Sequence, residues 1–203
     1  MNINEYQNYH ETKAHTSAEF PYNTYLCSIP LDFPGVPLHW HDELELVVIK
    51  RGQGFVSVDF DKRLVHSGDI IIIPPRCLHA IEQDDTFKME YENIIFKPDL
   101  LSSGANDLCM IQYIVPLLDG SLPIEYFLTP ALGSFEALSN CIRQIDLVCA
   151  DQTPGWQLAV KSSLFNFFFL LISERQKKTV STSSNSKSLE KMKTVLKYVE
   201  NHY

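Results

Sequence analysis

Short runs of apolar or alternating apolar and polar residues occupy about residues 20–97 of the chain, separated by turn-forming Pro, Gly and Asp. The clearest runs lie at residues 44–50, 54–60, 69–73 and 86–96. Alternation of this kind places one face of a strand in a core and the other in water. Several short strands with turns between them are typical of an antiparallel barrel or sandwich. We therefore expect a many-stranded antiparallel domain here.

Beyond these strands the pattern changes, and two helices are predicted between about residues 134 and 178. The first is amphipathic, with Ser134 as its N-cap. The second covers about residues 156–176, and from Leu164 to Ile172 apolar side chains cover every side of it. Because a helix that is apolar all round must be buried all round, we expect the same helix of a second subunit to cover part of it. The alternative is a helix wrapped by its own domain.

The C-terminal residues predict a linker and the start of another domain. Residues 177–188 (KKTVSTSSNSKS) are polar and rich in Ser and Thr, which is typical of a flexible linker. Residues 189–203 predict an amphipathic helix whose apolar face has nothing left to pack against. We therefore expect a barrel over 1–125, a helical segment over 126–176, the linker, and a last helix that opens a missing domain.

Composition and charge restrict the function. The formal net charge of −8 argues against a nucleic-acid-binding surface over most of the chain, because phosphate contacts require clustered Lys and Arg. The five cysteines show no C-x-x-C spacing, which favours a reducing cytoplasm. The polar amino terminus predicts no signal peptide, and no apolar run is expected to reach membrane-spanning length.

One group of side chains has the chemistry of a metal site. His39, His41 and Glu45 occupy positions of equal parity, so on one extended strand they would all point inward. His79 follows the run at 69–73 and a Pro-Pro turn, from which it could meet them. Three imidazoles and one carboxylate suit zinc, iron, manganese, nickel or copper. The alternative is a metal-free polar pocket whose side chains bond a ligand or one another.

Four neighbouring residues have more than one interpretation. Glu43 has the parity of an inward residue, although a bulge could turn it outward. Tyr91 is a pocket residue by parity, and plain packing is the alternative. Trp40 has the opposite parity and is expected to pack between the barrel and the helices. Arg76 is expected to form a surface ion pair, with an anionic ligand as the alternative.

Two motifs resemble those of the cupin superfamily. The first, HWHDELELVVIKRG from His39 to Gly52, matches His-x-His, three residues, Glu, six residues, Gly. The second, GDIIIIPPRCLH from Gly68 to His79, matches a Gly, five residues, Pro and a later His. This sequence departs from the pattern where Arg76 replaces a glycine, where Gln83 replaces an asparagine and where Gly35 lies too close to the first histidine. All four ligand-like positions remain.

Nearly the entire chain resembles AraC-family transcription regulators. The two motifs, the strand ending ENIIFKPDLL and the helix containing VKSSLFNFFFLL occur in the order expected of their sensor domains. The closing LEKMKTVLKYVENHY looks like the opening helix of their helix-turn-helix domain. The resemblance implies an α+β fold, in which a cupin (jelly-roll) β-barrel is followed by a helical pair used for dimerisation.

This resemblance also implies the ligands and partners. A small-molecule effector, with sugars as one candidate class, would bind the barrel through His39, His41, Glu43, Glu45, His79 and Tyr91. One divalent metal (Zn, Ni, Mn or Fe) would be held by His39, His41, Glu45 and His79. A homodimer would form through the helix around Leu164 to Ile172, and promoter DNA would be contacted only through the missing C-terminal domain.

Two alternatives stay open from the sequence. A metal-dependent cupin enzyme, such as a dioxygenase or a sugar isomerase, would use the same three histidines and glutamate as an open metal site. We do not favour an enzyme, because the sequence supplies no obvious acid–base pair around such a metal. In the second alternative the pocket is vestigial and the barrel only packs and dimerises.

Overall fold

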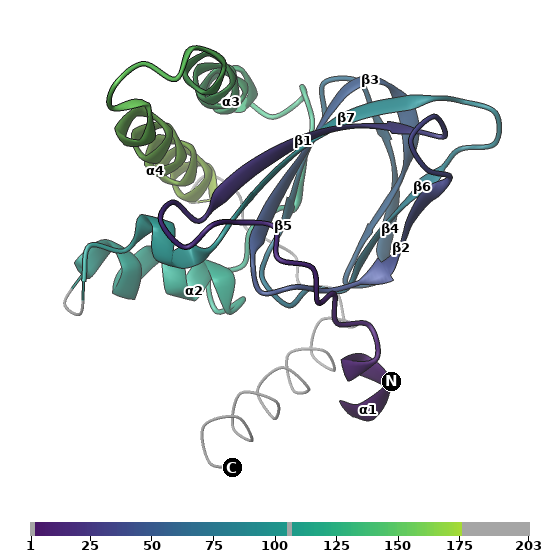
Figure 1. Cartoon of the computed structure of the whole chain (residues 1–203), viewed down its shortest axis with the longest axis horizontal. Helices are drawn as coiled ribbons and strands as arrows, with labels where there is room; N and C mark the ends of the chain where they lie inside the picture. Colours follow the sequence, from purple (N-terminus) through teal and green to yellow (C-terminus); the bar gives the residue numbers. More distant parts are fainter. Residues whose placement is uncertain (1–2, 105–106, 176–203) are drawn as a thin grey trace.

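The computed structural model describes residues 3–104 and 107–175, which form a β-barrel with helices packed against one side (Figure 1). This arrangement confirms the expected α+β class, a barrel followed by a helical pair. The predicted linker at 177–188 and the predicted helix at 189–203 lie outside the described residues. In chain order the elements are α1 (Ile3–Gln7), β1 (Tyr22–Ile29), β2 (Gly35–His39), β3 (Leu44–Val58), β4 (Asp61–His66), β5 (Ile70–Ile73), β6 (His79–Gln83), β7 (Met89–Phe96), η1 (Pro98–Leu101), η2 (Met110–Ile114), α2 (Val115–Leu118), β8 (Phe127–Leu128), α3 (Phe135–Asp151) and α4 (Trp156–Arg175).

The long strand β3 belongs to both halves of the barrel. Its first part pairs with β5 and β7, and its second part pairs with β4 and β6, all antiparallel. The register against β7 shifts between Ile49 and Arg51, and Gly52 follows with a φ of +77°. The runs predicted at 44–50 and 54–60 are therefore one strand with a bend between them. The bend lets one strand close both sheets, because a bulge increases local twist.

The first part of β3 is buried on both faces. Val47 and Ile49 point into the interior of the barrel, whereas Leu46 and Val48 pack with the helices outside it. Continuous apolar runs are typical of strands covered on both sides. The sequence ELELVVI thus folds into the wall between two cores.

Helices α3 and α4 pack together on the outer side of the sheet that contains β1, β7 and β3 (Figure 1). Lys50 links α3 to this sheet, since its ammonium lies 2.6 Å from Glu92 and 3.0 Å from Asp146. Ser134 is the N-cap residue as predicted, but its hydroxyl makes no capping hydrogen bond. The predicted helical segment also contains β8, a two-residue strand that pairs with β5 before α3 begins.

Within this chain α4 is buried on one side only, so the alternative of a helix wrapped by its own domain is wrong. Leu164 and Phe167 are completely buried, whereas Leu158 and Phe169 are 74% and 64% exposed. By length and composition, Trp156–Glu174 could also cross a membrane, so the expectation that no run reaches that length is wrong. A core helix passes the same test, and the buried side of α4 packs on the barrel.

The parity of Trp40 predicted that it packs between the barrel and the helices, and this prediction is wrong. Its ring stacks on Tyr6 and His10, with centroids 4.8 and 4.1 Å away, and its indole N–H donates to the Tyr6 carbonyl. The side chain is buried by the first residues of the chain, which the sequence pattern had left without structure.

Candidate metal and ligand site

Four of the predicted site residues meet near one end of the barrel. His39 is the last residue of β2 and His79 the first of β6; they are cross-strand partners with ring centroids 4.0 Å apart. His41 lies in the turn that follows β2, and Glu45 is the second residue of β3. The argument from parity on one strand was therefore wrong in detail. The turn and the pairing of two strands, rather than a single extended strand, make these side chains converge.

Backbone carbonyls fix the orientation of two imidazoles. His39 Nδ1 lies 2.9 Å from the Pro37 carbonyl, and His79 Nδ1 lies 2.9 Å from the Cys77 carbonyl. Because a carbonyl can only accept, each Nδ1 carries a proton, and in the neutral form of each ring the lone pair would lie on Nε2. Histidines that bind metals are oriented by this kind of hydrogen bond.

Glu45 is the charged centre of the group. Its Oε2 lies 3.0 Å from His41 Nε2 and 3.4 Å from His79 Nε2. Burial alone would raise the pKa of Glu45, but its contacts with His41 and His79 lower it well below the usual range. Burial and the neighbouring His79 lower the pKa of His39 to about 4, so this imidazole is neutral at pH 7.

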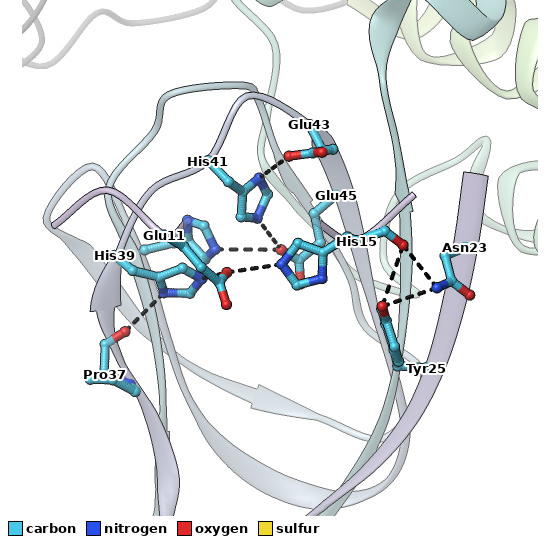
Figure 2. Close-up of polar contacts among 10 residues, drawn as sticks. Glu11, His15, Asn23, Tyr25, Pro37, His39, His41, Glu43 and Glu45 are labelled. Atoms are coloured by element: carbon cyan, nitrogen blue, oxygen red, sulfur yellow. Dashed lines mark hydrogen bonds and ion pairs between the residues drawn. The ribbon is translucent and has the colours of Figure 1, made fainter. Parts of the chain in front are cut away.

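The remaining predicted residues differ in their distance from this group. Glu43 is 7% exposed, and its Oε2 lies 3.7 Å from His41 Nδ1, so it belongs to the cluster (Figure 2). Tyr91 points into the apolar interior of the barrel, and its strand neighbours are Cys27 and Ile49. Burial raises the pKa of Tyr91 far above its usual range. Its hydroxyl is therefore neutral.

Two functional candidates were missed by the sequence analysis. Figure 2 shows Glu11 and His15 pointing toward the same group from the N-terminal segment, which we define as residues 8–20. Glu11 Oε2 lies 3.0 Å from His15 Nε2 and 3.4 Å from His39 Nε2. The hydrogen bond with His15 lowers the pKa of Glu11. A carboxylate four residues before a histidine was the only signal in a polar stretch without periodicity.

The donor set fits a divalent transition metal. His39, His41 and His79 each offer one nitrogen, and the three nitrogens lie within 4.8 Å of one another. Among the described residues, the buried Nε2 of His79 has no hydrogen-bond partner. A buried polar atom without a partner is costly, and a metal would satisfy it. Glu45 would add a carboxylate to these three imidazoles.

Arg76 has the structural role expected of a surface residue. Its Nε donates to Asp42 Oδ1 at 2.9 Å, and both side chains are about half exposed. Its φ of +63° shows that it adopts the left-handed conformation that favours the glycine it replaces in the cupin motif. The turn is thus preserved despite the substitution.

The fold and the site together define a cupin-type ligand-binding domain. The family model described as the AraC-like ligand binding domain matches residues 25–168, which is more than half of the chain. The chain therefore belongs to this family, which confirms the resemblance to AraC-family regulators and the reading of the barrel as an effector-sensing domain.

Two relatives from Bacillus subtilis are named as HTH-type transcriptional regulators. The chain is 24% identical to the HTH-type transcriptional regulator YdeC over 97% of its own length and 67% of that protein. It is 22% identical to the HTH-type transcriptional regulator YbfI over 82% of its own length and 56% of that protein. The chain thus spans about two thirds or less of the regulators it matches.

Solved cupins are similar over part of the chain. A cupin protein from Bacteroides fragilis is 24% identical over 43% of this chain and 80% of that protein, with a TM-score of 0.37. The oxalate decarboxylase of Bacillus subtilis, which contains Mn(II) centres, is 20% identical over 38% of this chain and 21% of that protein, with a TM-score of 0.32.

Proposed function

We propose that the end of the barrel binds a small-molecule effector and that a divalent metal takes part in holding it. The metal ligands are three imidazoles and a carboxylate, and zinc, nickel, manganese and iron all suit that set. The effector contacts the open coordination positions and the neighbouring polar side chains, and sugars are one candidate class. The proposed metal ligands are His39, His41, Glu45 and His79, and the proposed effector contacts add Glu43 and Tyr91.

The observation that supports this proposal is a buried imidazole nitrogen without a hydrogen-bond partner. His79 Nε2 is buried, accepts no hydrogen bond from the described residues and faces the Glu45 carboxylate at 3.4 Å. A group that only packed the barrel would bury an apolar side chain here at lower cost. The vestigial alternative leaves this arrangement unexplained.

A thermal-shift screen with sugars, organic acids and divalent metals tests the proposal. A ligand that binds only the folded state adds RT ln(1 + [L]/Kd) to stability, about 2.7 kcal/mol at 100 times Kd. We expect a metal to raise the Tm of the native chain and not that of His79→Ala. His66→Ala is the matched control, because His66 is an exposed histidine on β4 of the same barrel.

The outcomes separate the three functions. Stabilisation by a metal, and further stabilisation by one class of small molecule, would support the sensor. No shift with any compound would support the vestigial pocket. A measured turnover that disappears in His79→Ala would replace the sensor by the cupin enzyme.

We also propose that α3 and α4 form a homodimer. Leu158 and Phe169 are exposed, and Phe165 and Ile172, at helical spacing from them, are only partly buried against the core. A second copy of this helix pair would cover that apolar side, as the sequence pattern predicts. Promoter DNA would then be bound in the cytoplasm by the helix-turn-helix domains of the two subunits, and the effector would bias their arrangement.

Light scattering at micromolar concentration tests the dimer. We expect a dimer for the native chain and a monomer for Phe169→Glu. Leu31→Glu is the control, because Leu31 is 68% exposed in the loop between β1 and β2, away from the helices. A monomeric native chain, or a dimer that survives Phe169→Glu, would contradict this interface.

A further inference from the structure

The N-terminal segment crosses the end of the barrel and is fastened on both sides of the candidate site. On one side the backbone of Trp40, next to β2, donates to Tyr9 and accepts from Glu11, both at 2.9 Å. On the other side Asn23 of β1 donates its amide to the His15 carbonyl at 2.9 Å. Because β1 and β2 belong to different sheets, the segment joins the two halves of the barrel. The Glu11 and His15 side chains lie between the anchors (Figure 2).

In two places of the cluster an imidazole Nε2 faces a carboxylate oxygen. His39 Nε2 lies 3.4 Å from Glu11 Oε2, and His79 Nε2 lies 3.4 Å from Glu45 Oε2. Each imidazole already donates its Nδ1–H to a carbonyl, so in the neutral ring a lone pair faces a carboxylate oxygen. Such a contact is unfavourable unless a cation lies between the two atoms or the imidazole is protonated and donates to the carboxylate. The contact between Glu11 and His39 therefore has the same atoms and the same distance as the contact between Glu45 and His79.

Three separations agree with those between ligands of one metal ion, whereas the nitrogens of His39, His41 and His79 lie up to 4.8 Å apart and would have to move closer on binding. Metal–ligand bonds of about 2.1 Å place neighbouring ligand atoms about 3.0 Å apart in an octahedral site and about 3.4 Å apart in a tetrahedral one. The contact between His41 and Glu45 is 3.0 Å, and the other two contacts are 3.4 Å. Glu11 is thus spaced from His39 as a second ligand of the same ion would be.

We propose that Glu11 is an additional metal ligand contributed by the N-terminal segment, with His15 as the residue that positions its carboxylate. The proposal rests on the metal site proposed above. His15 lies with Nε2 3.0 Å from Glu11 Oε2, its side chain is 10% exposed, and its ring packs edge-on against Tyr25. A metal bound in this way would join both sheets and the N-terminal segment at a single point.

Cobalt(II) titration of the full chain, followed by calorimetry and visible absorption, tests the assignment. We expect the native chain to bind one Co²⁺, and Glu11→Gln to bind it at least about 10-fold more weakly with an altered spectrum. Glu19→Gln should bind as the native chain does, because Glu19 is an exposed glutamate of the same segment. His15→Leu should weaken binding, and His15→Gln, which keeps a donor, should restore most of it.

Limited trypsin digestion gives a second readout that does not depend on affinity. Lys13 is the only Lys or Arg before Lys50, and it lies exposed between the two proposed residues. Co²⁺ should slow cleavage after Lys13 in the native chain and in Glu19→Gln, but not in Glu11→Gln even when that variant is saturated. The N-terminal fragment is followed by mass spectrometry.

The results distinguish this inference from the function on which it rests. Equal affinity, spectrum and protection in the native chain and in Glu11→Gln would overturn the role of Glu11 and leave the three-histidine site intact. Failure of the native chain to bind Co²⁺ would overturn the metal site itself, and the role of Glu11 with it.

Discussion

Replacement of Gly52 by alanine tests whether the bend in β3 holds the two halves of the barrel together. Gly52 has a φ of +77°, and an added Cβ would overlap the Lys88 carbonyl oxygen of β7's preceding loop. The same Cβ would lie 2.9 Å from the Lys88 carbonyl carbon and 3.3 Å from Met89 Cα. These contacts are with backbone, so no side chain can rotate away and the strands themselves must separate.

The expected cost has two parts. A left-handed conformation costs a non-glycine residue about 1–2 kcal/mol. Displacing packed backbone costs about 1–3 kcal/mol more, by analogy with overpacked cores. The unfolded alanine variant has less conformational entropy than the glycine chain, which offsets about 0.4–1 kcal/mol of this loss of stability. We therefore expect Gly52→Ala to lose about 3 kcal/mol, which for a chain of this size lowers Tm by about 6–12 °C.

Gly120→Ala is the matched control. Gly120 has a φ of +79°, and an added Cβ there meets nothing within 4 Å. It therefore isolates the conformational strain, and we expect a loss of about 1 kcal/mol, or about 2–4 °C. Thermal unfolding of both variants by circular dichroism gives the comparison. Equal losses in the two variants would refute the argument that the backbone of β3 and β7 is in contact at this bend.

Three further predictions concern charge and turn geometry. Without metal, the chain should lose stability as pH falls from 6.5 toward 4, because the pKa of His39 is about 4 when folded and the unfolded chain binds the proton first. The full shift corresponds to about 3 kcal/mol, and partial exposure reduces this loss to about 1–2 kcal/mol. In urea unfolding at several pH values, the free energy of unfolding of His39→Gln should therefore change less with pH than that of the native chain. Arg76→Gly should be about 1 kcal/mol more stable than Arg76→Ala in thermal unfolding, because only glycine relieves the positive φ, while both variants lose the exposed ion pair with Asp42. Lys50→Met should lower the free energy of unfolding by about 1–3 kcal/mol, measured in urea, because Glu92, 12% exposed, loses the ammonium that lies 2.6 Å away; an unchanged midpoint would show that this bridge does not hold α3 to the sheet.

Local periodicity predicted the parts of the fold in which each segment is buried on a defined face. The runs at 44–50, 69–73 and 86–96 were correctly predicted to contain strands, because most residues of β5, β7 and the first part of β3 are buried. The break around Gly52 was read as a turn because glycine interrupts the pattern, whereas the pairing with β7 continues through it. The sequence pattern of β3 alone cannot show that β7 pairs with it on both sides of the bend.

The sequence predicted those residues of the candidate site that lie in the two cupin-like motifs, and it did not predict the others. His39, His41, Glu45 and His79 were found by residue type and spacing, and the structure brings them together. Glu11 was missed because its position depends on backbone pairing with Trp40, a contact between residues 29 positions apart in an irregular segment. The same pairing explains why the parity argument misplaced Trp40.

The composition of the site has a consequence for how binding would act on the rest of the molecule. Glu45 belongs to the sheet covered by α3 and α4, whereas His39 and His79 belong to the opposite sheet. A ligand that draws these donors together must therefore pull the two sheets toward each other. The helix pair proposed to dimerise packs on the outer face of the sheet that contains Glu45, so a movement at the site would reach that interface through β3. An effector could shift the proposed dimer only by its difference in affinity for two such arrangements, so under this proposal sensing would depend on the wall between the two cores.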